Sequence, residues 1–171
     1  MENLDIKNLY KKFTENLLSY LILLKKEFHE VNKFINSLKN YEPYKIDVSE
    51  TTPQQSALNI AVIISYARNF KRNFGFYNAF EINKILIQDF RDEEIKLHKQ
   101  MIKWRDTEFA HSDADSNDIL IDMDENFSYS MRRIRQPLEK NELDFLSSMV
   151  HKIEAQVEKQ IKCLKCVIKN A

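Results

Sequence analysis

Apolar residues recur at steps of three and four along most of this chain, which is the spacing of amphipathic helices. The longest such stretch lies near the start and contains neither proline nor glycine. In the second stretch, apolar residues occur nearly all round the helix, so this segment is expected to be the most buried. The pattern predicts helices over residues 6–38, 53–73, 79–88, 93–111 and 141–168.

Residues near the expected helix ends agree with these boundaries. Thr52 followed by Pro53 is typical of an N-cap with proline at the first helical position. Gly75 lies just past the expected end of the second helix, where glycine often terminates a helix. Pro137 interrupts the chain before the last helix, and Asn141 is the residue expected to cap that helix.

A period of two marks one short region before the last helix. Every second residue of segments 119–123 and 127–131 is apolar, and the polar residues 124–126 lie between them. This pattern predicts a small β-hairpin. We therefore expect a single domain over residues 1–171, an all-α, up-and-down bundle of four to five helices with a β-hairpin before the last helix.

Composition restricts the function classes that this fold could serve. The chain has one glycine, which excludes a glycine-rich phosphate loop or dinucleotide-binding turn. It has 26 basic and 26 acidic residues and no net charge, so any nucleic-acid binding must come from a local patch. Candidate basic residues for such a patch are Arg68, Arg132, Arg133 and Arg135.

Location and metal binding are also constrained by the sequence. The first residues lack the basic region of a signal peptide, and the apolar run 17–24 is too short to span a membrane, so we expect a cytoplasmic protein. Cys163 and Cys166 lie in a helical pattern without a second ligand pair, which favours structural thiols over a zinc site. Residues 113–124 imitate a calcium loop but lack its central glycine, so a solvated acidic loop is favoured.

The segment Trp104-Arg-Asp-Thr-Glu-Phe-Ala-His-Ser-Asp113 carries the main candidate chemistry. Five residues separate Arg105 from His111, and the polar residue Asp106 follows the arginine. This arrangement resembles the Arg-x(4-6)-His signature of the HEPN superfamily, in particular its abortive-infection and toxin-type members. The predicted helical bundle, with the motif in a late helix, agrees with the fold of that family.

The resemblance implies a metal-independent endoribonuclease that needs no cofactor. In such members two chains pair through the motif-bearing helix, and the partners implied are RNA and an antitoxin protein. His111 would act as the acid and base, since histidine titrates near neutral pH. Arg105 would bind phosphate oxygens, and Asp106 or Asp113 would orient these side chains.

Other interpretations of the same residues remain open. Arg91 and His98 also match the spacing, with Asp92 as the polar follower. On a regular helix Arg105 and His111 lie about 120° apart, so they do not share a face. Arg105 could instead be a buried arginine paired with a carboxylate. The chain would then be a non-catalytic helical module that binds a protein or nucleotide, or an unrelated helical scaffold.

Overall fold

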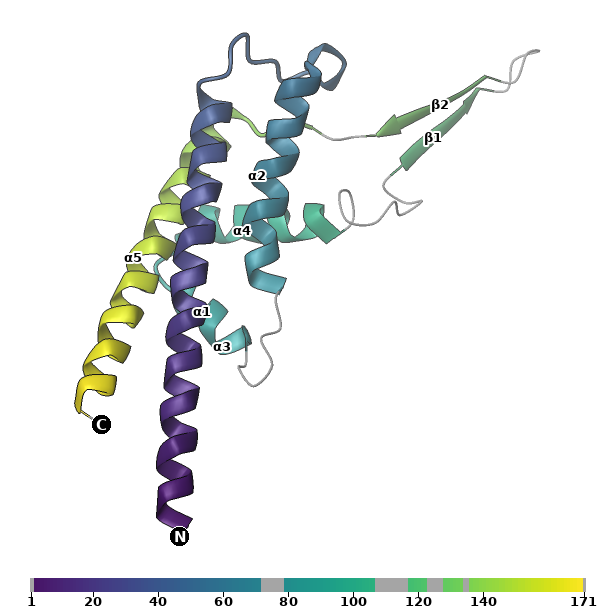
Figure 1. The fold of residues 1–171 in the computed structure, drawn as a ribbon. Coiled ribbons are helices and arrows are strands. Elements are labelled where there is room, and N and C mark those ends of the chain that lie inside the picture. The colour runs from purple at the N-terminus through teal and green to yellow at the C-terminus, as the bar shows by residue number, and fades with distance from the viewer. Residues whose placement is uncertain (1, 72–78, 107–116, 123–127, 134–135, 171) are drawn as a thin grey trace.

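The computed structural model describes residues 2–71, 79–106, 117–122, 128–133 and 136–170 (Figure 1). The predicted all-α bundle is confirmed. The described chain forms α1 (Glu2–Lys39), η1 (Val48–Glu50), α2 (Pro53–Lys71), α3 (Ala79–Ile87), α4 (Asp92–Trp104), β1 (Asn117–Asp122), β2 (Ser128–Arg133) and α5 (Lys140–Asn170). β1 and β2 pair antiparallel, with Ile119 opposite Met131, in the region where the hairpin is predicted.

Three helices lie side by side along the molecule. α1 runs antiparallel to both α2 and α5, and it packs against each of them (Figure 1). α4 departs from the up-and-down arrangement, because it crosses the other helices and contacts α2 and α5. The hairpin projects to one side, and the last residues of α4 lie on that same side.

The core is formed mainly by a seam between α1 and α5. Its buried side chains are spaced by three and four residues on both helices, which is the alternation found where two helices interlock over a long distance. On α2 the aromatic rings of Tyr66 and Phe70 close the core around Phe28 of α1, with ring centroids 5.2 to 6.2 Å apart. The seam comprises Leu24, Phe28, Val31, Ile35 and Leu38 of α1 and Leu143, Leu146, Val150, Ile153, Val157 and Ile161 of α5.

The two helix starts predicted from local sequence have different outcomes. Thr52 caps α2 as predicted, because its hydroxyl accepts the backbone N–H of Gln55 at 3.2 Å. Asn141 is not the N-cap residue of α5 as predicted, because it lies inside the helix, where its side-chain oxygen accepts the N–H of Glu142 at 2.7 Å. α5 begins one residue earlier, and the N–H of Glu139 donates to the carboxylate of Glu142 at 2.8 Å, so Glu142 supplies the capping contact from inside the helix.

A buried carboxylate joins the start of α4 to α5. The side chain of Glu94 is fully buried and accepts hydrogen bonds from the backbone N–H of Arg91 at 2.8 Å, from Ser148 Oγ at 3.1 Å and from Lys152 Nζ at 2.6 Å. The guanidinium of Arg91 adds a contact at 3.3 Å. Burial alone would raise the pKa of Glu94, but these donors outweigh it and lower the pKa to about 2.

Lys152 extends this network to the turn before α4. Its ammonium also donates to the backbone carbonyl of Asp89 at 3.1 Å. Gln156, one turn further along α5, donates to the carboxylate of the same aspartate. The buried network centred on Glu94 therefore fixes both the turn between α3 and α4 and the first turn of α4 against α5.

Glu94→Gln is expected to lower the free energy of unfolding by about 3 kcal/mol at pH 7, because Lys152 loses its buried partner. In the parent protein the Glu94 contribution is complete above pH 4.5, the ordinary pKa, and is lost as the pH falls toward 2. The variant should lack this loss. Urea unfolding at pH 7 and pH 3 measures both effects.

Glu93→Gln is the matched control, since Glu93 is exposed on the same turn of α4. An equal loss of stability in both variants at pH 7 would contradict the assignment of Glu94 as the anchor of α4.

Candidate functional site

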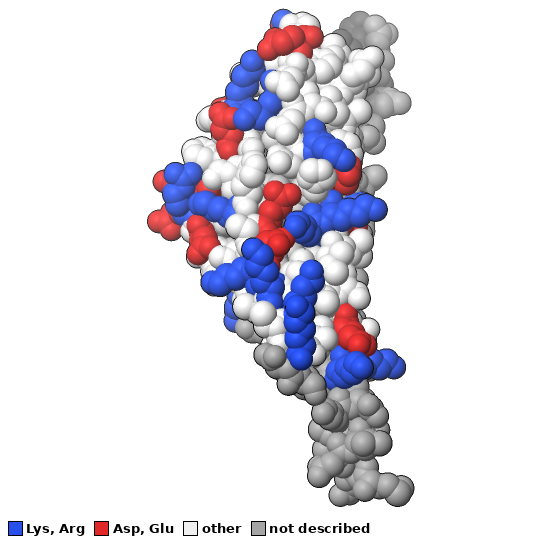
Figure 2. All heavy atoms as spheres, turned by 60° about the vertical axis from the view of Figure 1, so that its left-hand side comes forward, with Lys and Arg blue, Asp and Glu red and all other residues white. Residues whose placement is uncertain are grey.

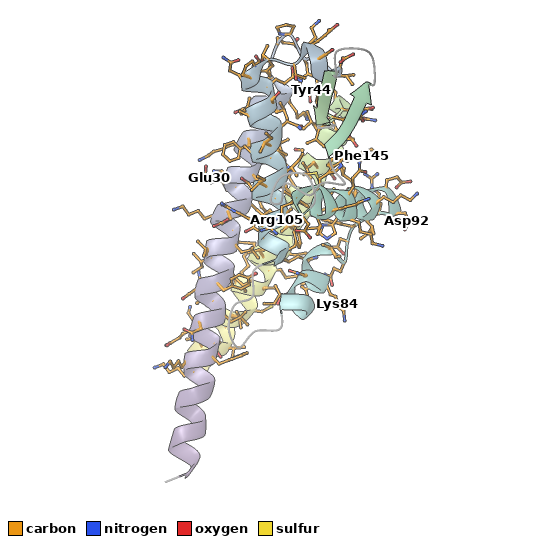
Figure 3. The ribbon with its side chains drawn as sticks, turned by 90° about the vertical axis from the view of Figure 1, so that its right-hand side faces the viewer. Glu30, Tyr44, Lys84, Asp92, Arg105 and Phe145 are labelled. Carbon is orange, nitrogen blue, oxygen red and sulfur yellow. The ribbon has the colours of Figure 1, made fainter. Side chains whose placement is uncertain are left out.

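Arg105 lies at the end of α4, where regular α-helical geometry stops. Arg105 and the following Asp106 have π-helical geometry, and the N–H of Arg105 is shared between the carbonyls of Met101 and Ile102. The predicted continuation of this helix to His111 lies outside the described residues. Figure 3 shows Asp92 and Arg105 at opposite ends of α4.

The Arg105 guanidinium is oriented by its neighbour in the sequence. Its Nη1 donates to a carboxylate oxygen of Asp106 at 2.9 Å, and both side chains are about one-third exposed, at 30% and 32%. α4 holds this pair in place because Leu97 and Met101 are buried in the core. An arginine of this kind retains further N–H donors for an anion that approaches from solvent.

The remaining predicted site residues are only partly covered by the structure. His111, Asp113 and Arg135 lie outside the described residues. Arg132 and Arg133 lie in β2, where they pair in register with Asp118 and Asn117 of β1. The described residues place Arg132 and Arg133 on the hairpin, and a common site formed by the full set stays a prediction.

Arg68 has a partner on another helix. Its Nε and Nη2 both donate to one carboxylate oxygen of Glu27 in α1, at 3.0 and 2.7 Å. The carboxylate side chain is 13% exposed and the arginine side chain 43% exposed. This contact joins α1 to α2, so Arg68 has a structural role whatever else it contacts.

His98, the histidine of the alternative Arg/His pair, is partly buried and packs against aromatic residues of the core. Its Nδ1 is 2.9 Å from the hydroxyl of Tyr66, and its ring meets Phe70 edge to face with centroids 4.5 Å apart. The ring of Phe90 also meets the imidazole edge to face, with ring centroids 6.0 Å apart. Burial, with a smaller contribution from the charge of Lys99, lowers the pKa of His98 to about 4. His98 is therefore neutral at physiological pH.

Arg91, its partner in that spacing, is also used structurally. Its backbone N–H and guanidinium both contact Glu94, and the guanidinium lies 5.7 Å from the ring centre of Phe145. The Arg91/His98 match thus consists of a helix-start arginine and a core histidine. It is a poor acid–base pair, because a histidine with a pKa near 4 is rarely protonated near pH 7.

The two cysteines do not lie in the core. Cys163 and Cys166 are both free and exposed on α5, which corrects the interpretation of them as structural thiols. The physical reason is that α1 covers the seam positions Val157 and Ile161, whereas the cysteines occupy the outer side of the helix. Across the ranges that the structure describes, no group of three or more His, Cys, Asp or Glu side chains is placed to hold a metal ion.

Glu94 is the polar residue whose importance the sequence analysis missed. A signal was present, because Glu94 precedes Leu97 and Met101 by three and seven residues and so continues the buried stripe of α4 toward its start. Because acidic residues are common in the first turn of a helix, Glu94 resembles an ordinary first-turn residue in the sequence.

Comparison with known proteins returned no match to a family model, to a curated protein or to a solved structure. Among the described helices, none is both long enough and apolar enough to cross a membrane.

The buried His98 predicts a loss of stability in mild acid. Its pKa is 6.5 when unfolded and about 4 when folded, so the unfolded chain takes up a proton first. Stability is complete above pH 6.5 and falls by about 3 kcal/mol as the pH approaches 4. His98→Phe should remove most of this slope, as measured by urea unfolding at half-unit steps between pH 7 and pH 4.

His29→Gln serves as the control, because His29 is exposed on α1. A slope between pH 6.5 and 4 that persists unchanged in His98→Phe would show that other groups cause it.

Proposed function

We propose that this protein is a metal-independent endoribonuclease of the toxin or antiviral-defence type, related to the HEPN superfamily. In this proposal Arg105 binds the scissile phosphate, and His111 transfers protons. The protein acts on RNA in the cytoplasm and needs no cofactor.

The proposed reaction uses the RNA's own 2′-hydroxyl as the nucleophile. The 2′-oxygen forms a bond to phosphorus and gives up its proton to a base, while the bond from phosphorus to the 5′-oxygen breaks. The leaving oxygen takes a proton, and a 2′,3′-cyclic phosphate remains on the upstream fragment. Histidine suits the proton transfers, and arginine can place two N–H groups on the oxygens of the phosphorane.

The observation that carries this proposal is the environment of His98, the histidine of the other Arg/His pair that matches the motif spacing. Arg91 belongs to the Glu94 network, and its companion His98 is a neutral core residue. Arg105 instead ends a well-anchored helix, is partly exposed and is held by a neighbouring carboxylate. The arginines alone do not separate the pairs, since the side chain of Arg91 is 59% exposed and that of Arg105 is 30% exposed. The neutral, enclosed His98 is what disfavours the first pair, and it leaves Arg105/His111 as the proposed one.

Asp106 is proposed as the residue that orients Arg105. Its carboxylate accepts a hydrogen bond from Nη1, which restricts rotation of the guanidinium. Asp113 is proposed in a similar supporting role toward His111. Arg132, Arg133 and Arg135, together with the exposed part of Arg68, are proposed to contact the RNA backbone.

The proposed partners follow from the same resemblance. A second copy of the chain would pair through the α4 region and bring two Arg/His sets into one cleft. An antitoxin protein is the further partner expected for a toxin of this type.

A non-catalytic helical module is the second candidate function. It is favoured by the ion pair itself, because the charge of Arg105 is already balanced by Asp106. In that case the protein would bind a partner protein or nucleotide without cutting RNA.

Purified protein in EDTA should cleave single-stranded RNA and leave 2′,3′-cyclic phosphate ends. His111→Ala and Arg105→Ala should each lower the cleavage rate by at least about 100-fold, the usual effect of removing an acid–base group or an oriented charge. Denaturing gels of end-labelled RNA, followed by mass spectrometry of the products, measure the rate and the chemistry.

His151→Ala is the matched control, since His151 is an exposed histidine of α5. If the parent protein and all variants leave every RNA intact while folded, the nuclease proposal fails and the binding module takes its place.

A further inference from the structure

The C-terminal part of α5 presents an exposed basic surface. Lys159, Lys162, Lys165 and Lys169 are all exposed, and no acidic residue occurs between positions 159 and 171. We call these four residues the α5 lysine face. Figure 2 shows basic side chains prevailing over the lower half of the side of the molecule on which α5 lies, with few acidic ones among them.

The lysines of this face have no carboxylate partners within the part of the chain that the structure describes. Four lysines elsewhere do have one: Lys33 pairs with Glu30, Lys39 with Asp144, Lys45 with Glu50 and Lys140 with Glu42. Single exposed lysines without a carboxylate partner among the described residues, such as Lys26 and Lys96, also occur, so what distinguishes the α5 lysine face is that four of them lie on one helix. The nearest acidic residue on α5, Glu158, is bound by Lys25 of α1. The charges of the α5 lysine face are therefore left to interact with solution.

The positive charge of the α5 lysine face affects the neighbouring carboxylate of Glu158. Its pKa is lowered, first by the contact with Lys25 and also by the charges of Lys162 and Lys165. Both lysines thus lie on the same side of α5 as Glu158. One carboxylate that already has a partner cannot neutralise the whole face.

The helix dipole explains the position of only some residues of the α5 lysine face. Cations in the last turn of a helix are favoured by its dipole, and Lys169 lies in that turn. Lys159 and Lys162 precede the last residue of α5 by eleven and eight positions, which is more than two turns. The dipole effect is confined to the last turn, so it gives no reason for these two lysines.

The packing of α5 also argues against a membrane as the partner. A basic amphipathic helix binds a bilayer by burying its apolar face among the lipids. The apolar face of α5 is already buried against α1, from Leu143 to Ile161. Among its exposed residues, Val167 is the large apolar one. Large exposed apolar residues nearby, Phe13, Ile22 and Leu23, belong to α1 and not to α5. The face of α5 itself has free charge and little free apolar area, which fits a hydrophilic polyanion.

We propose that the α5 lysine face binds the phosphate backbone of RNA. This inference rests on the proposed function, because it names the surface that holds the substrate outside the cleavage site. The four lysines rise along one helix by three or four residues at a time. They can therefore contact successive phosphates without reading the base sequence.

The test measures binding of a fluorescent 20-nucleotide oligouridine by fluorescence anisotropy, with His111→Ala as the parent so that cleavage cannot interfere. Replacing all four lysines by glutamine should weaken binding about tenfold or more at 50 mM salt. It should also reduce the slope of log affinity against log salt by about 3, since each phosphate contact contributes roughly 0.7 for single strands. Replacing the four by arginine should preserve binding.

The matched control replaces Lys33, Lys39, Lys45 and Lys140 by glutamine. It removes the same total charge, but from lysines that are paired. An equal loss in this control, or unchanged binding in the α5 variant, would overturn the proposal. So would binding to vesicles of phosphatidylcholine and phosphatidylserine without binding to RNA. Circular dichroism melting confirms that each variant is folded.

The proposal and the nuclease function can fail separately. If RNA binding depends on the four lysines and the protein with His111 intact still does not cut, the binding surface stands and the nuclease proposal falls. If that protein cuts and the four-lysine variant binds RNA normally, the surface proposal falls alone.

Discussion

The buried carboxylate of Glu94 is the contact on which the position of α4, and with it the candidate site, depends. A buried charge costs several kcal/mol unless donors surround it, and here the donors come from Arg91, Ser148 and Lys152. Hydrogen bonds are directional, so this set of donors is satisfied in one placement of α4 on α5. Arg105 lies at the far end of the same helix, and its location is a consequence of that placement (Figure 3).

Features determined by neighbours in the sequence could be predicted, and features determined by distant partners could not. The two long helices α1 and α5 were predictable because the apolar period of each persists over many turns, and the Thr52 cap because the contact spans three residues. That α1 and α5 pack against each other was not predicted. The crosswise path of α4 depends on side chains of α5 more than fifty positions away. The start of α5 was misplaced because Glu142 caps it from inside, a role that an asparagine near the boundary concealed.

In the candidate site, too, the sequence gives the spacing of the residues and the structure gives their surroundings. The spacing of arginine and histidine occurs twice in this chain and cannot by itself separate a reactive pair from a structural one. For Arg91 and His98 the environment indicates structural roles. The aromatic rings around His98 keep it neutral, and the guanidinium of Arg91 donates to Glu94. For Arg105 the sequence already pointed to Asp106 as its neighbour, and the structure adds that the two side chains form an ion pair at the end of α4.

Net charge conceals how charge is distributed over the surface. Ion pairs cancel each other at short range, and salt screens exposed charges beyond about 8 Å, so unpaired lysines dominate what an approaching polyanion meets. The α5 lysine face lies near the C-terminal end of the molecule, whereas the hairpin with Arg132 and Arg133 projects near the opposite end (Figure 1). In the proposed binding mode, a strand of RNA held by the lysines extends along the bundle to reach the hairpin.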